Sequence, residues 1–424
     1  MDLYYTFSIL IVLTAFFSYL NLRFIKLPST IGIMIFAMIA SLSLVALGKT
    51  YPEFHTQFAQ IIASVDLSEV LMGAMLNFLL FAGAIHISLH DLRKQRVPIM
   101  IFSTLGVIIS TFVVGALMYG AFMLLHMPIR FIQCLVFGAL ISPTDPIAVI
   151  AILQKAGIRK SLEIKVAGES LFNDGVAVVL FVVLLQLARG SEIDITFIHV
   201  SGLFIQEAGG GLVVGVLLGY LGSQGIKRIN DYNVTVMITL AIVMGGYLVT
   251  RYLHISGPLT MVAAGLVVGN YGKATAMSAS DKDYLDKFWE IIDEILNGML
   301  FLIIGFELLL IPDLRQYWLI GSISVLVVLL ARFFSIWLPI RFIPAIGKFD
   351  RKTITILVWG GLRGGVSVAL ALTIDDALDK NLFLAITYII VVFSIIVQGL
   401  TIGRLTTWQR ASLVVKAPAR NRKR

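Results

Sequence analysis

The chain has 424 residues, of which 58% are hydrophobic and only 14% are charged, and its mean hydropathy is +0.93. Soluble domains carry about a quarter charged residues, so this composition excludes a soluble protein and indicates a chain that lies mostly in lipid. The formal net charge of +8 does not indicate a nucleic-acid partner, because the basic residues lie between apolar segments without a nucleic-acid-binding motif.

Apolar segments long enough for a helix to cross a bilayer, about 20 residues, recur from end to end. In chain order they predict thirteen membrane-spanning helices, at residues 3–22, 29–47, 69–88, 97–125, 130–153, 161–187, 203–225, 233–251, 256–270, 289–311, 316–340, 353–374 and 381–403. The predicted fold class is therefore an all-α polytopic membrane protein, with a single membrane domain over 1–403 and a short basic tail over 404–424. The first segment lacks a basic leader and a cleavage pattern, so we expect it to be retained.

Lys and Arg divide unevenly between the loops on the two sides of these spans. Most of the 33 basic residues lie in alternate loops and in the tail, whereas the opposite side has only Lys49, Arg130, Arg189, Arg251, Arg315 and Lys380. The positive-inside rule then predicts a cytoplasmic C-terminus and, for an odd number of spans, an external N-terminus. We expect an integral protein of a bacterial inner membrane.

The fifth predicted span is interrupted by polar residues and prolines. Pro143 and Pro146 flank Thr144 and Asp145, and each proline removes a backbone donor and disfavours helix at the residue before it. A broken helix at this depth is tolerated only where it lines a cavity or is buried in protein. The alternative is a turn outside the membrane, but apolar residues continue on both sides.

The sixth predicted span places four polar side chains in an otherwise apolar helix. Glu169 and Asn173 are four residues apart, as are Ser170 and Asp174, so the two pairs share one face. Carboxylate, hydroxyl and carbonyl oxygens suit a small hard cation, whereas the ligands of a transition metal are missing. As an alternative, Glu169 is a solvated acid in the first turn, but Asp174 lies about 6 Å deeper.

Two arginines lie within the last predicted spans. Arg332 stays charged, so it needs a buried acid, for which Glu169 is our first choice; the alternative is that it extends to an interface. Arg363 lies in a glycine cluster with Gly361 and Gly364, which predicts a second broken helix. Arg363 then either caps carbonyls of a half-helix or marks the cytoplasmic end of the span.

Two further features carry weaker predictions. Glu307 is a candidate second-site acid, although we favour a structural partner for it. Gly211, Gly215 and Gly219 repeat every four residues, a spacing that lets helices approach closely. Cys134 lies in an apolar segment. Because it is the only cysteine, disulfides within the chain and cysteine-based metal sites are excluded.

Three motifs together resemble the monovalent cation/proton antiporter superfamily, in its sodium/proton exchanger branch with an Asn-Asp pair. They are Ser-Pro-Thr-Asp-Pro at 142–146, Gly-Glu-Ser-Leu-Phe-Asn-Asp-Gly at 168–175 and Gly-Gly-Leu-Arg-Gly at 360–364, and the resemblance covers nearly the whole chain. It implies inverted repeats, broken helices that cross in spans 5 and 12, a core domain mainly of spans 4–6 and 11–13, and a dimerisation domain mainly of spans 1–3 and 7–10. A homodimer in contact with membrane lipid is therefore expected.

The resemblance also implies roles for individual residues. Asp174 resembles the ion-binding aspartate, Asn173 its paired asparagine, and Thr144 and Ser170 the oxygen donors for Na⁺, while Asp145 resembles a broken-helix acid. Glu169 and Arg332 match the family's buried ion pair. The chain departs from many relatives at Phe81-Ala82-Gly83-Ala84, where an acid is missing, so we assign no ion-coordinating role there.

We therefore expect a transporter, not an enzyme, that exchanges Na⁺ or Li⁺ for H⁺ without a cofactor, with cation and proton competing for Asp174. Electroneutral exchange of one cation for one proton is expected. A K⁺/H⁺ antiporter remains the alternative, because ion selectivity depends on cavity geometry. An intramembrane aspartyl protease would need Tyr-Asp and Gly-x-Gly-Asp contexts, which the aspartates at 145 and 174 lack. A channel fits one exchangeable acid and broken helices less well.

Overall fold

The computed structural model describes residues 3–48, 75–146, 149–150, 153–154, 160–190, 197–229, 231–309, 314–347 and 349–405. These residues are helical throughout, apart from turns and one isolated antiparallel bridge between Asp145 and Leu362. Eight helices are long and apolar enough to cross a membrane, and two shorter apolar helices accompany them. Most of the tail predicted over 404–424 lies outside the described residues.

The first two helices form a hairpin beside the rest of the chain. They are α1 (Leu3–Leu20) and α2 (Ser29–Gly48), and a π-helical turn at Asn21–Ile25 extends α1. The Asn21 side chain holds the connection, because its Nδ2 donates to the Leu27 carbonyl at 2.9 Å and its Oδ1 accepts from the Leu27 amide at 3.2 Å. Both helices pack against α17 (Ala279–Glu307).

The next helices follow residues 49–74, which lie outside the described ones and include the beginning of the predicted span at 69–88. They are α5 (Leu76–Ile85), α6 (Leu89–Lys94), α7 (Arg96–Ser103), α8 (Leu105–Leu124) and α9 (Phe131–Ile141). The predicted span at 97–125 is interrupted at Thr104, whose hydroxyl donates to the Met100 carbonyl at 2.5 Å. A side chain that bonds the preceding turn in this way tends to bend a helix.

The middle of the chain supplies one long central helix and a closely packed group. The central helix is α11 (Lys160–Ala188), and the group comprises α12 (Phe197–Phe204), α13 (Gly210–Ile226), α14 (Tyr232–Leu253), α15 (Gly257–Val267) and α16 (Lys273–Ala276). A Cβ at Gly215 would overlap the Thr260 carbonyl, and one at Gly219 would lie 2.9 Å from the Ala264 carbonyl. The glycine repeat therefore does let α13 approach α15 closely.

The last helices complete the bundle. They are α17, α18 (Trp318–Phe342), α19 (Arg351–Trp359), α20 (Gly365–Leu372) and α21 (Lys380–Phe393), which a π-helical turn at Ser394–Gln398 continues. Helix α17 begins ten residues before its predicted start at residue 289. A capping box stabilises this beginning, because the Ser278 hydroxyl accepts from the Asp281 amide at 3.2 Å and Asp281 Oδ2 accepts from the Ser278 amide at 3.1 Å.

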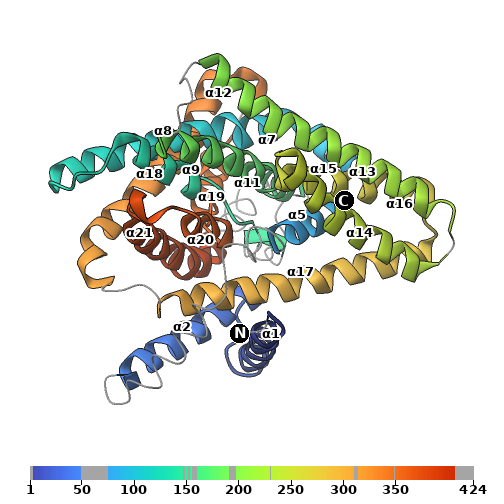
Figure 1. Ribbon diagram of the computed structural model, residues 1–424, viewed down its shortest axis with the longest axis horizontal. Helices are drawn as coiled ribbons and strands as arrows, with labels where there is room; N and C mark the ends of the chain where they lie inside the picture. Colours follow the sequence, from blue (N-terminus) through green and yellow to red (C-terminus); the bar gives the residue numbers. More distant parts are fainter. Residues whose placement is uncertain are drawn as a thin grey trace, which may run out of the picture.

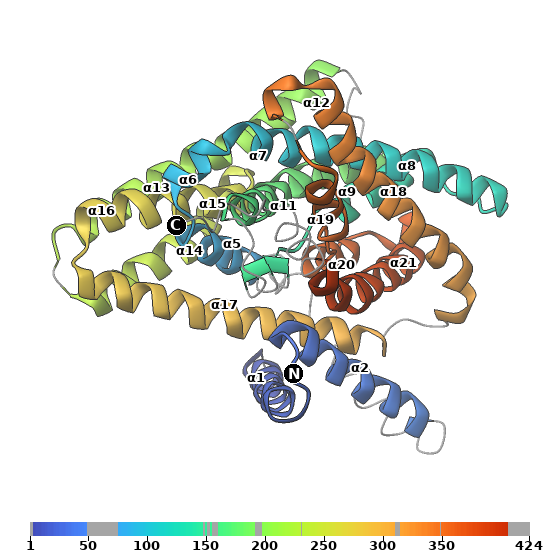
Figure 2. The same ribbon diagram turned by 180° about the vertical axis from the view of Figure 1, so that it is seen from behind.

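Helix α17 runs along one side of the molecule, as Figures 1 and 2 show, with α1 and α2 beyond it. On its other side, α5, α13, α14, α15 and α16 gather at one end and α8, α9, α18, α20 and α21 at the opposite end. Helix α11 lies between the two groups and contacts α9, α15 and α20. The predicted polar residues of the sixth span lie on this central helix.

Candidate ion-binding site

The helix of the fifth predicted span is interrupted immediately after α9, where Pro143 and Pro146 prevent it from continuing. Two residues of the second broken segment, between α19 and α20, form hydrogen bonds with the exposed backbone. Arg363 Nη1 donates to the carbonyls of Ser142 at 2.7 Å and Pro143 at 2.9 Å. The Asp145 amide donates to the Leu362 carbonyl at 2.8 Å. The two broken segments therefore lie against each other.

The second break separates α19 from α20, and its glycines are needed for close approach. A Cβ at Gly361 would lie 2.5 Å from Arg332 Nε, and one at Gly364 would overlap the Asp145 carboxylate. Of the two interpretations of Arg363, the structure shows contact with half-helix carbonyls, and its side chain is buried. Its Nε and Nη2 have no hydrogen-bond partner among the described residues.

Two polar residues that we did not predict support the same break. The Ser394 hydroxyl accepts from the Arg363 amide at 2.8 Å and donates to Gln398 Oε1 at 2.8 Å, while Gln398 Nε2 donates to the Trp359 carbonyl at 3.0 Å. Ser394 and Gln398 are four residues apart within an apolar span. That spacing on one face is the signal that would have identified them.

The polar face of α11 meets the first break. Glu169, Ser170 and Asn173 are at most 2% exposed and Asp174 is 9% exposed. Asn173 Nδ2 donates to Thr144 Oγ1 at 2.8 Å, and Thr144 Oγ1 lies 3.1 Å from Ser170 Oγ. Two hydroxyl oxygens from different segments are thus brought together one helical turn from Asp174.

Asp174 lies in a closely packed part of α11. A Cβ at the next residue, Gly175, would overlap the side chain of Leu259 on α15, so α15 covers this turn. The Asp145 carboxyl is near enough to the Asp174 carboxyl to interact with it electrostatically. The two aspartates therefore share one environment at the point where α11 passes the crossing of the broken segments.

The buried arginine of α18 contacts the acid one turn before Asn173. Arg332 Nη1 donates to Glu169 Oε1 at 2.5 Å, and its Nε donates to the Leu357 carbonyl at 3.3 Å. Both side chains are at most 10% exposed, and Glu169 lies in the third turn of α11 rather than at its solvated beginning. Arg332 does not extend to an interface.

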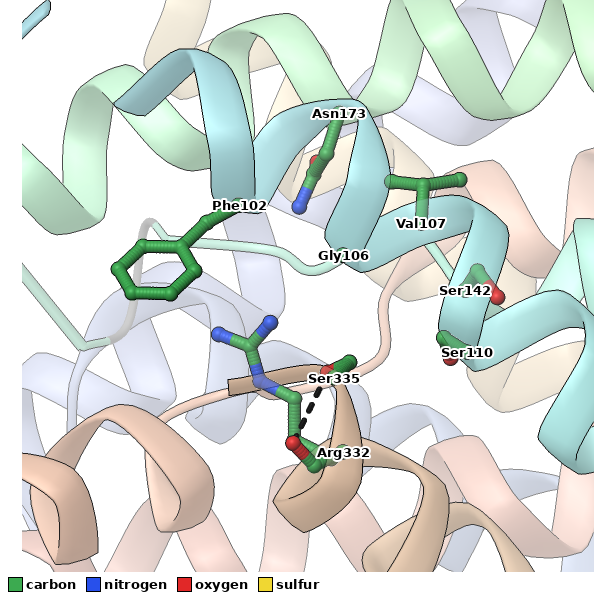
Figure 3. Close-up of a pocket in the computed structure, with 8 residues that line it drawn as sticks. All are labelled: Phe102, Gly106, Val107, Ser110, Ser142, Asn173, Arg332 and Ser335. Atoms are coloured by element: carbon green, nitrogen blue, oxygen red, sulfur yellow. Dashed lines mark hydrogen bonds between the residues drawn. The ribbon is translucent and has the colours of Figure 1, made fainter. Parts of the chain in front are cut away.

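A small polar pocket adjoins this pair (Figure 3). Asn173 and Arg332 point into it from opposite sides. The Asn173 Oδ1 atom has no hydrogen-bond partner among the described residues, and neither has the Ser110 hydroxyl on the pocket wall. Ser335 donates to the Arg332 carbonyl at 2.9 Å. Asn173 therefore contacts Thr144 through its Nδ2 and lines the pocket with its Oδ1 unpaired among the described residues.

Within the described ranges, no group of three or more His, Cys, Asp and Glu side chains is placed to hold a metal ion. Cys134 is buried and free. The oxygen-rich arrangement at Asp174 instead suits a cation that exchanges its water for hydroxyl and carboxylate oxygens.

Comparison with known proteins identifies related transporters. The family model described as "Sodium/hydrogen exchanger, transmembrane" matches residues 11–408. The Na(+)/H(+) antiporter NhaP of Pseudomonas aeruginosa is 48% identical over 403 residues, which are 93% of this chain and 94% of the relative. The Na(+)/H(+) antiporter NhaH of Halobacillus aidingensis is 32% identical over 391 residues, which are 90% and 91% of the two chains.

A solved structure has the same fold. The sodium proton antiporter MjNhaP1 from Methanocaldococcus jannaschii superimposes with a TM-score of 0.76, covering 96% of this chain and 99% of that one. Its sequence identity is 20%, so this likeness carries the arrangement of helices and not the chemistry of individual residues.

Proposed function

Because this chain belongs to the sodium/hydrogen exchanger family and is an integral membrane protein with several spans, we propose that it is a secondary antiporter of Na⁺ and H⁺. The single observation that carries the proposal is the cluster of oxygens at α11. The Thr144 and Ser170 hydroxyls lie 3.1 Å apart, one turn from Asp174. These are the ligands that a dehydrated Na⁺ or Li⁺ requires.

Exchange follows from competition for one carboxylate. Burial of Asp174 disfavours its charged form unless a cation or a proton compensates it. A bound Na⁺ excludes the proton, and a bound proton removes the charge that attracts Na⁺. If the empty, charged site crosses the membrane poorly, cation movement in one direction requires proton movement in the other. No cofactor takes part in this cycle.

The fixed charges around Asp174 support electroneutral exchange of one cation for one proton. Glu169 and Arg332 form an ion pair and cancel each other. The Asp145 carboxylate lies against Gly364, directly before the first turn of α20, where the amides of a helix N-terminus stabilise an anion. Buried Arg363 then balances Asp145. Asp174 supplies the one negative charge that is exchanged.

The crossing of the two broken segments supports the finer architecture. We propose thirteen spans in inverted repeats, with a core domain mainly of spans 4–6 and 11–13 that moves against a domain of spans 1–3 and 7–10. The second domain is the proposed dimer contact. The positive-inside rule supports a cytoplasmic C-terminus and an external N-terminus in a bacterial inner membrane. Crosslinking in native membranes tests the dimer.

Transport by the purified protein in proteoliposomes tests the function. We expect Na⁺ and Li⁺ gradients to drive proton movement, and Asp174→Asn to remain folded but inactive, because an amide neither releases a proton nor balances a bare cation. Proton movement driven equally well by K⁺ would favour the K⁺/H⁺ alternative. Normal exchange by Asp174→Asn would contradict the assignment of the site.

A further inference from the structure

Glu307, the last residue of α17, is a second buried acid. Its side chain is 0% exposed, and neither carboxylate oxygen has a hydrogen-bond partner among the described residues. The structural partner that we expected from the sequence is therefore missing from this part of the chain. Because the acid takes no part in the site at Asp174, its burial needs a separate explanation.

The last turns of α17 are fixed in place by α2. The Ser41 hydroxyl donates to the Gly305 carbonyl at 2.9 Å, and a Cβ at Gly305 would overlap that of Ala37. Glu307 lies two residues further along the same helix, on a side that faces away from that of Gly305. The segment of α17 that carries Glu307 is therefore held in place by α2, and the Glu307 side chain is fully buried.

The groups that face Glu307 lie mainly on α21. Tyr388 is 2% exposed, and its hydroxyl also lacks a partner within the described ranges. Tyr388 and Lys380, which begins α21, are both near enough to Glu307 to interact with it electrostatically. The packed helices α1, α2 and α20 contain no acidic or basic residue. We call the end of the protein that carries Lys380 the Lys380 face.

These surroundings determine the protonation of Glu307 in this conformation. An ionised carboxylate without hydrogen bonds, away from water, is far less stable than the neutral acid. Helix α17, which carries Glu307, contacts α20, which begins at the second break. Movement of α20 and α21 relative to α17 would therefore change the access of water to Glu307.

We propose that Glu307 is a second proton-binding group, protonated while the Lys380 face is closed and deprotonated when that face opens to water. The proposal rests on the antiport function proposed above and adds a proton site to it. On opening, the O–H bond of the acid breaks, the proton passes to water at the Lys380 face, and the carboxylate becomes hydrated. Closing requires that a proton return, so the proton concentration at that face controls the conformational step.

Infrared spectroscopy of the protein in lipid tests protonation directly, without requiring transport. At neutral pH we expect Asp174→Asn to keep a carbonyl stretching band from a protonated carboxylic acid, and the addition of Glu307→Gln to that variant to remove a component of this band. The matched control is Glu290→Gln, which removes an exposed acid of the same helix and should leave the band unchanged. An unchanged band in the double variant Asp174→Asn with Glu307→Gln would overturn the proposal, whether or not the protein exchanges Na⁺.

Isotope labelling keeps the test valid if Glu307→Gln does not fold. In Asp174→Asn protein with ¹³C-labelled glutamate carboxyls, the remaining band should shift to lower frequency, and the absence of such a shift would overturn the proposal.

Transport in right-side-out and everted vesicles tests whether protonation of Glu307 controls the opening of the Lys380 face. Glu307→Gln should flatten the dependence of the rate on pH at the Lys380 face while leaving that at the opposite face unchanged. If the rate in Glu307→Gln depends on pH at both faces as it does in the wild type, the proposal is contradicted.

Discussion

The hydroxyl oxygens of Thr144 and Ser170 lie 3.1 Å apart although the residues are separated by 26 positions in the sequence. One belongs to a break that follows a helix, and the other to the middle of a continuous helix. Neither hydroxyl alone makes a cation site. Their contact provides two neutral oxygens beside one acid.

We predict that Thr144→Ala and Ser170→Ala each weaken Na⁺ binding about tenfold. Each change removes one neutral oxygen, an effect of about 1 kcal/mol or slightly more. The measurement is the apparent Na⁺ affinity for exchange in proteoliposomes. Ser324→Ala is the control, because among the described residues this buried hydroxyl donates to the Ile320 carbonyl of its own helix, α18. Unchanged affinity in both variants would move the cation site elsewhere.

The pair between Arg332 and Glu169 should matter mainly for stability. Arg332→Ala leaves Glu169 buried without its partner, and breaking such a pair costs roughly 3–5 kcal/mol. We expect a lower melting temperature in detergent. The double variant Arg332→Leu with Glu169→Leu should recover part of the loss, because neither charge is left alone. A double variant as unstable as Arg332→Ala would show that an unpaired Glu169 does not cause the loss of stability.

Arg363 should be needed to hold the two breaks together. Arg363→Gln loses the charge and the reach to the carbonyls of Ser142 and Pro143, and hydrogen bonds to charged groups contribute about 1.5–3 kcal/mol each. We expect reduced thermal stability together with reduced exchange, and Arg363→Lys should fall between this variant and wild type. Wild-type stability and exchange in Arg363→Gln would exclude this supporting role.

The charge carried per cycle is open to direct measurement. If one cation exchanges for one proton, the equilibrium point of exchange does not depend on membrane potential. A net charge moved through 100 mV would shift it by about 2.3 kcal/mol. Proteoliposomes with equal ion gradients, held at different K⁺ diffusion potentials by valinomycin, make the comparison. A steep dependence on potential would show that a second charge moves.

His86 provides a prediction about pH at the end of a span, because the apolar helix α5 ends at Ile85, three residues before the predicted end of the span at residue 88. His86 follows this end of α5, and burial together with nearby Lys273 lowers its pKa from 6.5, although Asp286 and Glu290 act in the opposite direction. A lowered pKa favours the neutral imidazole in the folded state, so its contribution to stability is present above pH 6.5 and is lost as pH falls through the folded pKa.

Melting temperatures measured from neutral to acidic pH should therefore fall less in His86→Gln than in wild type. The effect is small, because the His86 side chain is 38% exposed. His90→Gln is the control on the neighbouring helix α6. Parallel melting curves for His86→Gln and wild type would show that this imidazole does not contribute to the loss.

Local chemistry explains which parts of the fold were predictable. Prolines at 143 and 146 and glycines at 360–364 break helices through their own backbone properties, so both breaks were visible in the sequence. The early start of α17 was not, because its charged first turns read as a loop between spans. They are helical because Ser278 and Asp281 cap each other and the helix continues beyond the apolar segment.

The site was predictable in its composition but not in all its contacts. Polar residues within apolar spans identified the acids and hydroxyls, while the roles assigned to them remain predictions. The contacts of Ser394 and Gln398 with the second break depend on how α21 packs, which no local pattern specifies. The isolation of Glu307 depends on packing in the same way. A partner was the natural expectation for a buried acid, and only the positions of α2 and α21 show that the described residues supply none.

The contact of Arg363 with Ser142 spans 221 positions of the sequence, and this has a consequence for biosynthesis. Chains emerge from the ribosome with the N-terminal part first, so α9 and its break enter the membrane long before Arg363 exists. Until the last spans are made, the carbonyls at Ser142 and Pro143 must be satisfied by water or by the insertion machinery. The nascent chain therefore assembles its ion site last, and a chain truncated before α19 would expose this break to cellular quality control.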